Sequence, residues 1–366
     1  MRSSERGCWS TTDDGTPVIT QSMVTSFSQC PREFYYGYVL GLRPRMTSKP
    51  LTRGTWIHAL LEAKANQEDW LPVHYAQLEK AQQTMFAEEA ESLAEECYNI
   101  MISYEYQYRN DPLTPIRAEL TVERPMLGGK ALYRGRIDLI VQDKDGDIWL
   151  VDHKTHQKFP DWNYRELAYQ HYSYLWAAAK SPQYAELGIP QPRGFIYDYI
   201  RTGAIKVPSI TTRGLVSRAT SAAAQTYPVL RNWMLGHEYM RVVDGQDVVI
   251  VQGSEGDYLR ELLETTRESD QLDKFRRDEL VFDSAQSTRQ MKSFLTTCKR
   301  MLDYRWADPD CVERNLGACS SYLCNYRDLT TADLMHGTSE IEQRTRYVCA
   351  GDPLDYYPDR QKGPKK

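Results

Sequence analysis

The sequence predicts an α/β fold, in which strands form a sheet and helices cover it. Short apolar runs typical of buried strands occur at 118–125, within 133–155 and at 194–200, and helix-like stretches lie before, between and after them. The chain has 366 residues, which is long enough to bury a full hydrophobic core. Length and pattern together favour one large α/β core that carries insertions over a set of independent modules.

The part of the chain before the first strand is expected to be mainly helical. After a polar N-terminal segment over 1–20, a helix is expected from about Ser26, and an amphipathic helix that carries His58 is bounded upstream by Pro50. The charged, alanine-rich stretch 72–108 is expected to form a helical insertion. These helices precede every strand of the predicted sheet.

Strand and helix signals alternate again after the central strands. A helix rich in tyrosine and alanine is expected around residue 170, another helix over 213–233, a strand from Asp247, and a charged helix over 257–277. The lysine-rich tail is expected to be disordered. The predicted divisions are a polar segment (1–20), a core (21–235), a strand-plus-helix insertion (236–300), a cysteine-containing segment that packs back on the N-terminal helix (301–350) and the tail (351–366).

The most informative stretch is the predicted hairpin over 133–155, which brings two carboxylates and a lysine together. Asp138 lies on the first apolar run, an Asp-Gly pair supplies the turn, and the second run carries Asp152 and Lys154. Positions 138 and 152 are symmetric about residue 145, so a three-residue loop places them opposite each other, within about one residue of register. Such carboxylates can hold a divalent cation, and the ammonium can orient water or neutralise charge on a phosphate. The hairpin therefore indicates phosphodiester-cleaving chemistry.

The same residues also fit a simple structural role. An Asp-x-Lys pattern beside a glycine turn is common on solvated hairpin edges. Here both strands are apolar on either side of the charges, as expected of buried strands, with Ile137, Leu139, Val141, Ile148, Leu150 and Val151. A buried pair of carboxylates is costly unless a cation compensates it, so the metal interpretation gains weight.

In their order along the chain, these residues resemble the RecB-type branch of the PD-(D/E)XK nuclease superfamily. That family has a histidine on an early helix, an aspartate strand, an Asp/Glu-x-Lys strand and a helix with Gln-x-x-x-Tyr, and the matching residues here are His58, Asp138, Asp152, Lys154, Gln170 and Tyr174. The resemblance covers about residues 20–200 and 311–330. It implies a restriction-endonuclease-like core, with a mixed central sheet flanked by helices, and a DNA nuclease that depends on Mg²⁺ or Mn²⁺.

The resemblance also implies roles for individual residues. His58, Asp138 and Asp152 would bind the metal ion, and the catalytic set would be Asp138, Asp152, Lys154, Gln170 and Tyr174. Packing is the alternative for some of them. A lone helical histidine is more often a packed or capping residue, and Gln170 and Tyr174 lie four apart in a helix whose tyrosines and alanines fit a core. The order of the whole set favours the functional roles.

Several cysteines resemble those of the iron–sulfur members of the family. The stretch around Cys30 is similar to their opening helix, and Cys319 and Cys324 stand in a stretch similar to their C-terminal motif, where three cysteines join the N-terminal one to bind a [4Fe–4S] cluster. This chain departs from that motif, because Thr330 stands at the last cysteine position and four residues instead of two separate Cys319 from Cys324. Either Cys311 replaces the missing ligand, or the cluster is lost and the thiols pack.

Composition narrows the classes of function. Because no apolar run approaches the length of a membrane span and the N-terminus lacks a signal-peptide core, a cytoplasmic location with reduced cysteines is expected. The net charge of -5 argues against a broadly basic nucleic-acid binder. DNA contact is therefore expected from local patches, such as Arg43, Arg45, Lys49 and Arg53, which fit a solvated loop equally well. Some of the 25 tyrosines could stack on unpaired bases, although most are expected to pack.

Three classes of function remain. The leading one is a metal-dependent DNA nuclease, expected to be an exonuclease or end-processing enzyme of recombination, repair or phage DNA metabolism. The alternative is a non-catalytic nucleic-acid-binding or complex-scaffold protein with a nuclease fold, and the intact set of Asp138, Asp152 and Lys154 speaks against it. The third class is a metalloenzyme of another chemistry. The sequence contains neither a phosphate-binding loop nor an H-E-x-x-H motif that would support it. The missing phosphate loop also argues against a helicase motor within this chain, and a helicase or recombination protein is an expected partner.

Overall fold

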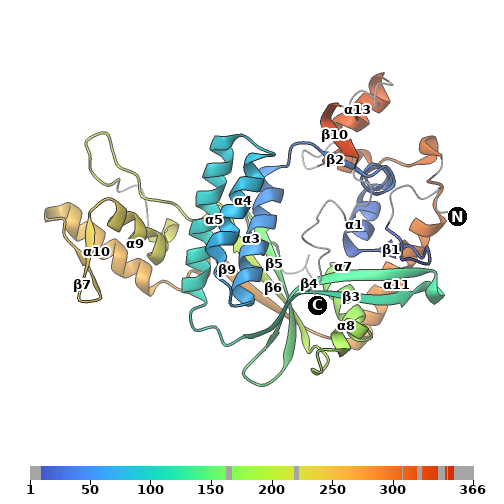
Figure 1. Ribbon diagram of the computed structural model, residues 1–366, viewed down its shortest axis with the longest axis horizontal. Helices are drawn as coiled ribbons and strands as arrows, with labels where there is room; N and C mark the ends of the chain where they lie inside the picture. Colours follow the sequence, from blue (N-terminus) through green and yellow to red (C-terminus); the bar gives the residue numbers. More distant parts are fainter. Residues whose placement is uncertain are drawn as a thin grey trace.

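A computed structural model of the protein describes residues 10–161, 167–217, 222–306, 308–319, 324–336, 343 and 345–349. Its centre is a six-stranded mixed sheet with helices on both faces, and a smaller lobe projects beyond α5 (Ala87–Gln107), at the left of Figure 1. The predicted α/β class, with a mixed central sheet flanked by helices, is confirmed.

The central sheet has the strand order β1-β4-β5-β6-β9, and β3 pairs with β4 beside this path. The strands β3, β4 and β5 are antiparallel neighbours, whereas β5 and β6 are parallel and therefore need a crossover connection, which contains α7 (Tyr169–Ala178) and α8 (Pro182–Ala185). The strand bounds are β1 (Val18–Ile19), β3 (Thr114–Met126), β4 (Ala131–Gln142), β5 (Ile148–His156), β6 (Gly194–Arg201) and β9 (Phe275–Val281).

The β4–β5 hairpin has the register that the sequence predicted. Its pairs run from Gln142↔Ile148 to Leu139↔Val151 and are symmetric about the centre of the turn. Gly146 in that turn has a φ of +87°, a conformation that glycine adopts without strain. Asp138 and Asp152 are the next residues beyond the last pair, so the hairpin places them across from each other.

One face of the sheet is covered by α3 (Lys49–Ala65), α4 (Trp70–Gln82) and α5. Their apolar sides share a core with Ile200 of β6 and Phe275 of β9. Pro50 lies in the first turn of α3, as predicted, because the missing N–H of proline costs nothing there. The stretch 72–108, expected to be helical, consists of two helices with a break between Gln82 and Ala87.

The other face is covered by α1 (Gln21–Gln29), α7 and α11 (Ser284–Asp303), which share the main core with β4, β5 and β6. The expected helix start near Ser26 is wrong. The helix begins after Thr20, whose hydroxyl accepts a hydrogen bond from the Met23 N–H at 3.3 Å, a common N-cap arrangement. It ends at Cys30, and α2 (Pro31–Phe34) with a short π-helix (Tyr35–Val39) continues the chain.

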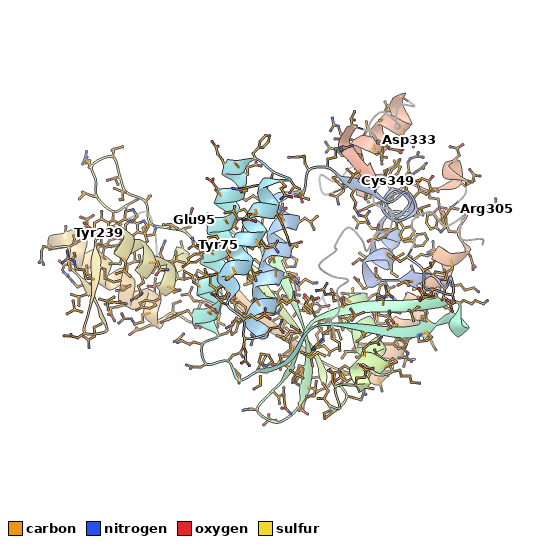
Figure 2. The ribbon with its side chains drawn as sticks, viewed as in Figure 1. Tyr75, Glu95, Tyr239, Arg305, Asp333 and Cys349 are labelled. Carbon is orange, nitrogen blue, oxygen red and sulfur yellow. The ribbon has the colours of Figure 1, made fainter. Side chains whose placement is uncertain are left out.

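The described part of the C-terminal segment lies against the N-terminal helices. Here β10 (Tyr347–Cys349) pairs with β2 (Leu42–Pro44), and the N–H of Arg32 donates to the Glu313 carbonyl at 3.0 Å. Figure 2 shows Cys349 near β2 and Asp333 on the neighbouring helix α13 (Arg327–His336). The predicted disordered tail, 351–366, lies outside the described residues.

The lobe differs from the expected helix over 213–233. In this region the chain makes a β-bridge between Ile210 and Val216, and α9 (Tyr227–Gly236) is the α-helix among the residues described there. The turn is enforced by Gly214, whose φ is +76°. With β7 (Met240–Val243), β8 (Gln246–Val249) and α10 (Gly253–Glu268), the lobe encloses its own core, formed by Val216, Leu230, Trp233, Met234, Met240, Leu259, Leu262 and Leu263.

The expected helix over 257–277 is also wrong at its end. The helix stops at Glu268, and the chain re-enters the central sheet as β9, which is antiparallel to β6. The range 236–300, expected to be an insertion, therefore includes a strand of the central sheet and α11 of the main core. The insertion is instead the part of the chain between β6 and β9.

Candidate active site

The first half of the site is the Asp138 carboxylate, near the point where β4 and β5 cease to pair. Its Oδ2 lies 3.3 Å from Nδ1 of His58, a residue of α3, which packs on one face of the sheet. The same oxygen accepts the main-chain N–H of His153 at 2.9 Å. Asp138 is 13% exposed, so these two contacts fix a carboxylate that solvent reaches only in part.

The second half is Asp152, which is almost fully buried. Lys154 Nζ lies 2.5 Å from its Oδ2, and Nε2 of Gln170, on α7, donates to its Oδ1 at 2.5 Å. Tyr174 follows one turn later on α7, hydrogen-bonds Gln170, and packs against Gly135, where an added Cβ would lie 3.1 Å from the tyrosine ring. The structure thus brings the two halves and the α7 residues together around one hairpin.

Burial and charge act against each other in this site. Burial alone would lower the pKa of His58, but the charge and hydrogen bond of Asp138 outweigh it and the pKa is raised. Burial would raise the pKa of Asp138, yet His58 holds it well below its usual range. The pKa of Asp152 is raised instead, because burial and the charge of Asp138 outweigh the opposing effect of Lys154. One carboxylate is firmly ionised, and the other is poorly compensated without a further cation.

Glu119 of β3 also belongs to this site, and the sequence interpretation missed it. It stands across from Asp138, between the pairs Ala118↔Leu139 and Leu120↔Ile137, and Arg136 forms an ion pair with it. Its φ of +53° is uncommon for a residue with a side chain. A signal existed, since Glu119 and Asp138 are symmetric about the Gly128-Gly129 turn.

A buried network on the α5 side supports the hairpin. The His153 imidazole Nδ1 lies 2.9 Å from Oδ2 of Asp198, a fully buried residue of β6. The Tyr104 hydroxyl donates to the same oxygen, and Nε of Arg277 lies 3.5 Å from the other one. Because the main-chain N–H of His153 donates to Asp138, the side chains from α5, β6 and β9 in this network help to fix the position of the carboxylate pair.

The residues present fit a divalent cation. Single ligand atoms of His58, Glu119 and Asp138 all lie within 4.8 Å of one another. Oδ2 of buried Asp152 contacts Lys154 Nζ at 2.5 Å and has no other hydrogen-bond partner within the described part of the chain. Carboxylate oxygens suit Mg²⁺ and Mn²⁺, and a single imidazole nitrogen shifts the preference toward Mn²⁺.

Comparison with known protein families agrees with this geometry. The family model described as the PD-(D/E)XK nuclease superfamily matches residues 18–329. The chain belongs to the PD-(D/E)XK nuclease superfamily. Nucleases of this superfamily use divalent metal ions, as the donor set of this chain also suggests.

Other comparisons add little about this PD-(D/E)XK protein. No curated protein matches the chain. A solved structure titled "Crystal structure of SSO0001" is similar over 68% of this chain and 74% of its own, with 12% sequence identity and a TM-score of 0.24. Among the described helices, none has the length and apolar character needed to cross a membrane.

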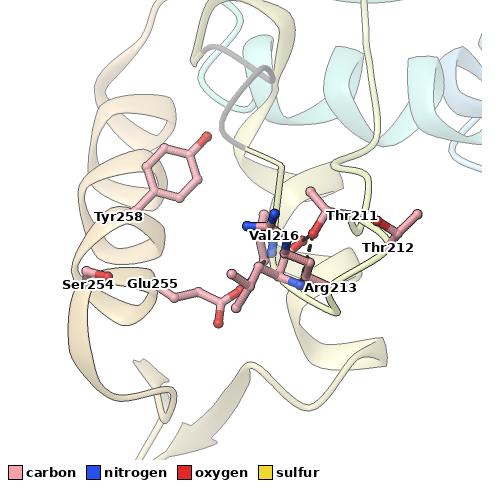
Figure 3. Close-up of a pocket in the computed structure, with 8 residues that line it drawn as sticks. Thr211, Thr212, Arg213, Val216, Ser254, Glu255 and Tyr258 are labelled. Carbon is pink, nitrogen blue, oxygen red and sulfur yellow. Dashed lines mark hydrogen bonds between the residues drawn. The ribbon is translucent and has the colours of Figure 1, made fainter.

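A cavity of about 410 Å³ lies away from the carboxylates, in the lobe (Figure 3). Glu255 and Tyr258 of α10 face the loop that contains Thr211 and Val216, and the Glu255 carboxylate accepts the Val216 N–H at 2.7 Å. That acid closes a loop and is used structurally, so the cavity does not compete with the hairpin as the candidate active site of a nuclease.

The predicted iron–sulfur cysteines are only partly described. Cys30 is buried, and its Sγ accepts the Asn315 N–H at 3.4 Å. The pKa of the Cys324 thiol is raised, mainly by burial and to a lesser degree by the charge of nearby Cys30. Cys311 is exposed, and its thiol donates to Asp308 at 2.9 Å. The side chain of Cys319 lies outside the described residues.

The basic residues expected to contact DNA are partly used within the fold. Arg43 donates to the carbonyls of Gly37 and Leu42, and Arg53 pairs with Glu96 at 3.0 Å. Arg45 and Lys49 lie between them along the chain. At least two of these four cations therefore have structural partners, which weakens this stretch as the main contact for DNA.

Proposed function

We propose that this protein is a metal-dependent DNA nuclease that hydrolyses phosphodiester bonds, as an exonuclease or end-processing enzyme of recombination, repair or phage DNA metabolism. The observation that carries the proposal is the juxtaposition of Asp138 and Asp152 across one hairpin, with His58 on the first carboxylate and Lys154 on the second. DNA is the expected partner. A separate helicase or recombination protein would supply strand opening, in the cytoplasm.

Each residue has a role in this proposal. His58, Asp138 and Asp152 would hold the cation, and Glu119 supports the same site as a further carboxylate. When bound, a divalent cation supplies Lewis-acid stabilisation of the phosphate and a more acidic water molecule. Lys154 would stabilise charge that develops on the phosphate, since its ammonium is partly exposed beside Asp152. Gln170, supported by Tyr174, fixes the orientation of the buried carboxylate.

The test uses end-labelled single- and double-stranded DNA and RNA, linear and circular, with Mg²⁺ or Mn²⁺. Asp138→Ala or Asp152→Ala should abolish cleavage while the fold survives, because each removes a ligand. Lys154→Ala should leave metal binding nearly intact but slow turnover by about 10²-fold or more, the usual scale for one charge-stabilising group. Asp145→Ala, in the exposed turn of the same hairpin, is the matched control and should cleave normally.

Different outcomes separate the alternatives. Cleavage of linear but not circular DNA would support the exonuclease assignment, and cleavage of both would support an endonuclease. Wild-type rates in purified Asp152→Ala would contradict the proposed site. Tight DNA binding without cleavage under any metal condition would favour the non-catalytic scaffold.

A [4Fe–4S] cluster held by Cys30, Cys319, Cys324 and a fourth ligand such as Cys311 stays a prediction within this proposal. Its support is the proximity of Cys30 and Cys324. Thr330, at the family's last cysteine position, is buried in α13 and contacts the Tyr36 hydroxyl, so this position faces the N-terminal helices.

A further inference from the structure

We propose that Arg201 and Arg276 form a second phosphate-binding subsite, which holds the substrate strand at a phosphate close to the bond that is cleaved. The inference rests on the proposed nuclease function. It assigns binding, separate from chemistry, to β6 and β9, two and three strands away from Asp138 of β4.

Strand register places the two arginines beside the catalytic lysine. Lys154 of β5 pairs with Tyr199 of β6, and Tyr199 pairs with Arg276 of β9. Residues paired across strands lie on the same face of a sheet, so these three side chains form one row. Arg201 lies two residues after Tyr199 on β6 and therefore shares that face, opposite His156.

The guanidinium of Arg276 is held flat and partly open. It stacks over the rings of Phe159 and Tyr199, 4.5 and 5.6 Å from their centroids. Its Nη2 donates to the Pro160 carbonyl at 3.2 Å, and its Nε lies 3.3 Å from Asp278. The side chain is still 33% exposed, so a ligand can reach it while the stacked rings hold its orientation.

Arg201 contributes a charge that is not balanced locally. Its Nε donates to the Gln157 carbonyl at 3.3 Å and its Nη1 to the Asp273 carbonyl at 3.4 Å. Within the described residues it forms no ion pair, and the nearby Asp273 carboxylate is engaged by Lys274 at 3.0 Å. A half-buried guanidinium with only carbonyl partners favours an anion as its next ligand.

The spacing fits a nucleic-acid backbone. Neighbouring strands lie about 4.8 Å apart, so the backbone at Arg276 is roughly 10 Å from that at Lys154, two strands away. The rise of about 3.4 Å per nucleotide is measured along the helix axis, and successive phosphates of one strand lie farther apart than this rise, so the separation spans fewer than three nucleotides. Lys154 would face the scissile phosphate, and the arginine pair a phosphate farther along the same strand.

A purely structural role is the competing explanation. Both arginines donate to carbonyls of the segment that follows β5, at Gln157 and Pro160, and could serve only to hold that segment. A structural role predicts loss of stability without a specific loss of phosphate contacts. Phosphate binding predicts a change in the salt dependence of affinity.

The first experiment measures binding of labelled single-stranded and duplex DNA by fluorescence anisotropy, from 50 to 300 mM salt, with Ca²⁺ in place of Mg²⁺. Arg201→Gln and Arg276→Gln should each weaken binding by about tenfold, and each should reduce the slope of log K against log salt by about 1. Arg276→Lys, which keeps the charge, should retain most of the slope. Arg241→Gln, an exposed arginine of β7 in the lobe, is the matched control and should change neither quantity.

The second experiment uses the wild-type protein, so it does not depend on the folding of any variant. Oligonucleotides that carry one uncharged methylphosphonate linkage are scanned across positions on both sides of the cleaved bond. Affinity should fall when the neutral linkage lies at one position within about three nucleotides of the cleaved bond, on one side only, and Arg276→Gln should lose no further affinity on that oligonucleotide. Wild-type affinity and salt slope in both glutamine variants, or no position dependence in the scan, would overturn the subsite.

The two proposals fail separately. Normal cleavage with unaffected binding in the arginine variants would remove the subsite and leave the nuclease assignment intact. Arginine-dependent binding without cleavage in any metal would leave the subsite and remove the nuclease assignment.

Discussion

Removal of the buried Asp198 carboxylate should weaken both the fold and the active site. Asp198 is fully buried and is shared by the imidazole of His153, the hydroxyl of Tyr104 and the guanidinium of Arg277. In Asp198→Ala, Arg277, which is 18% exposed, keeps its charge but loses its buried partner. Breaking a buried pair in this way costs about 3–5 kcal/mol, because the buried guanidinium keeps only the more exposed Asp111 as a carboxylate partner.

The free energy of unfolding is measured by urea denaturation, followed by far-UV circular dichroism. Asp111→Ala is the matched control. Asp111 pairs with the same guanidinium at 2.8 Å but is 21% exposed, so its loss should cost about 1 kcal/mol. The double variant Asp198→Ala/Arg277→Met removes both buried charges and should be more stable than Asp198→Ala alone.

The same substitution should also weaken metal binding. Asp198 contacts the imidazole of His153, and the main-chain N–H of His153 holds Asp138. Binding of Mn²⁺ to Asp198→Ala, measured by calorimetry well below its unfolding transition, should therefore be weakened by about 10-fold or more. A loss of stability below about 1 kcal/mol, or a double variant no more stable than the single one, would refute the electrostatic reasoning.

The remaining predictions are simpler to test. His58→Ala should cost more activity with Mn²⁺ than a packing change would, with little change in melting temperature; a large drop in melting temperature with unchanged metal affinity would identify a core histidine instead. Glu119→Gln should weaken Mn²⁺ binding by calorimetry, and an unchanged affinity would exclude it as a ligand. Burial lowers the pKa of His171 to about 4 from 6.5, so the stability from its neutral form is complete above pH 6.5 and is lost toward pH 4, by about 3 kcal/mol in all; His171→Gln should remove that acid sensitivity in urea titrations at pH 7.5 and 4.5. Anaerobically purified protein should be brown and contain iron and sulfide, Cys30→Ser should destabilise it, and Thr330→Cys should raise its iron content, whereas colourless, iron-free and active protein would show that these thiols merely pack.

The hairpin could be predicted from the sequence because its geometry is local. The position of Asp138 relative to Asp152 follows from a short turn, and the same symmetry about Gly128-Gly129 would have found Glu119. The partners of His153 could not be found in this way. Asp198 and Arg277 come from β6 and β9, which are distant in sequence, and only the pairing of those strands brings them together.

The errors at element ends have a similar cause. The stretch that contains Arg276 and Arg277 is charged and continues a helical pattern, and it becomes a strand because the edge of β6 offers it partners. Long-range pairing overrides local propensity there. The missed start of α1 is different, because Thr20 was available in the sequence as an N-cap signal.

The chain leaves the sheet after β6 and returns as β9, directly beside the strand it left. The Arg201 N–H donates to the Lys274 carbonyl at 2.8 Å, so the whole lobe occupies the place of a hairpin loop. A two-residue turn could join these strands without altering their register. Because the lobe has a core of its own, we expect it to open locally, and hydrogen exchange there should report opening that leaves the catalytic strands protected. A change in the length or fold of the lobe would therefore leave the pairing of β6 with β9 intact.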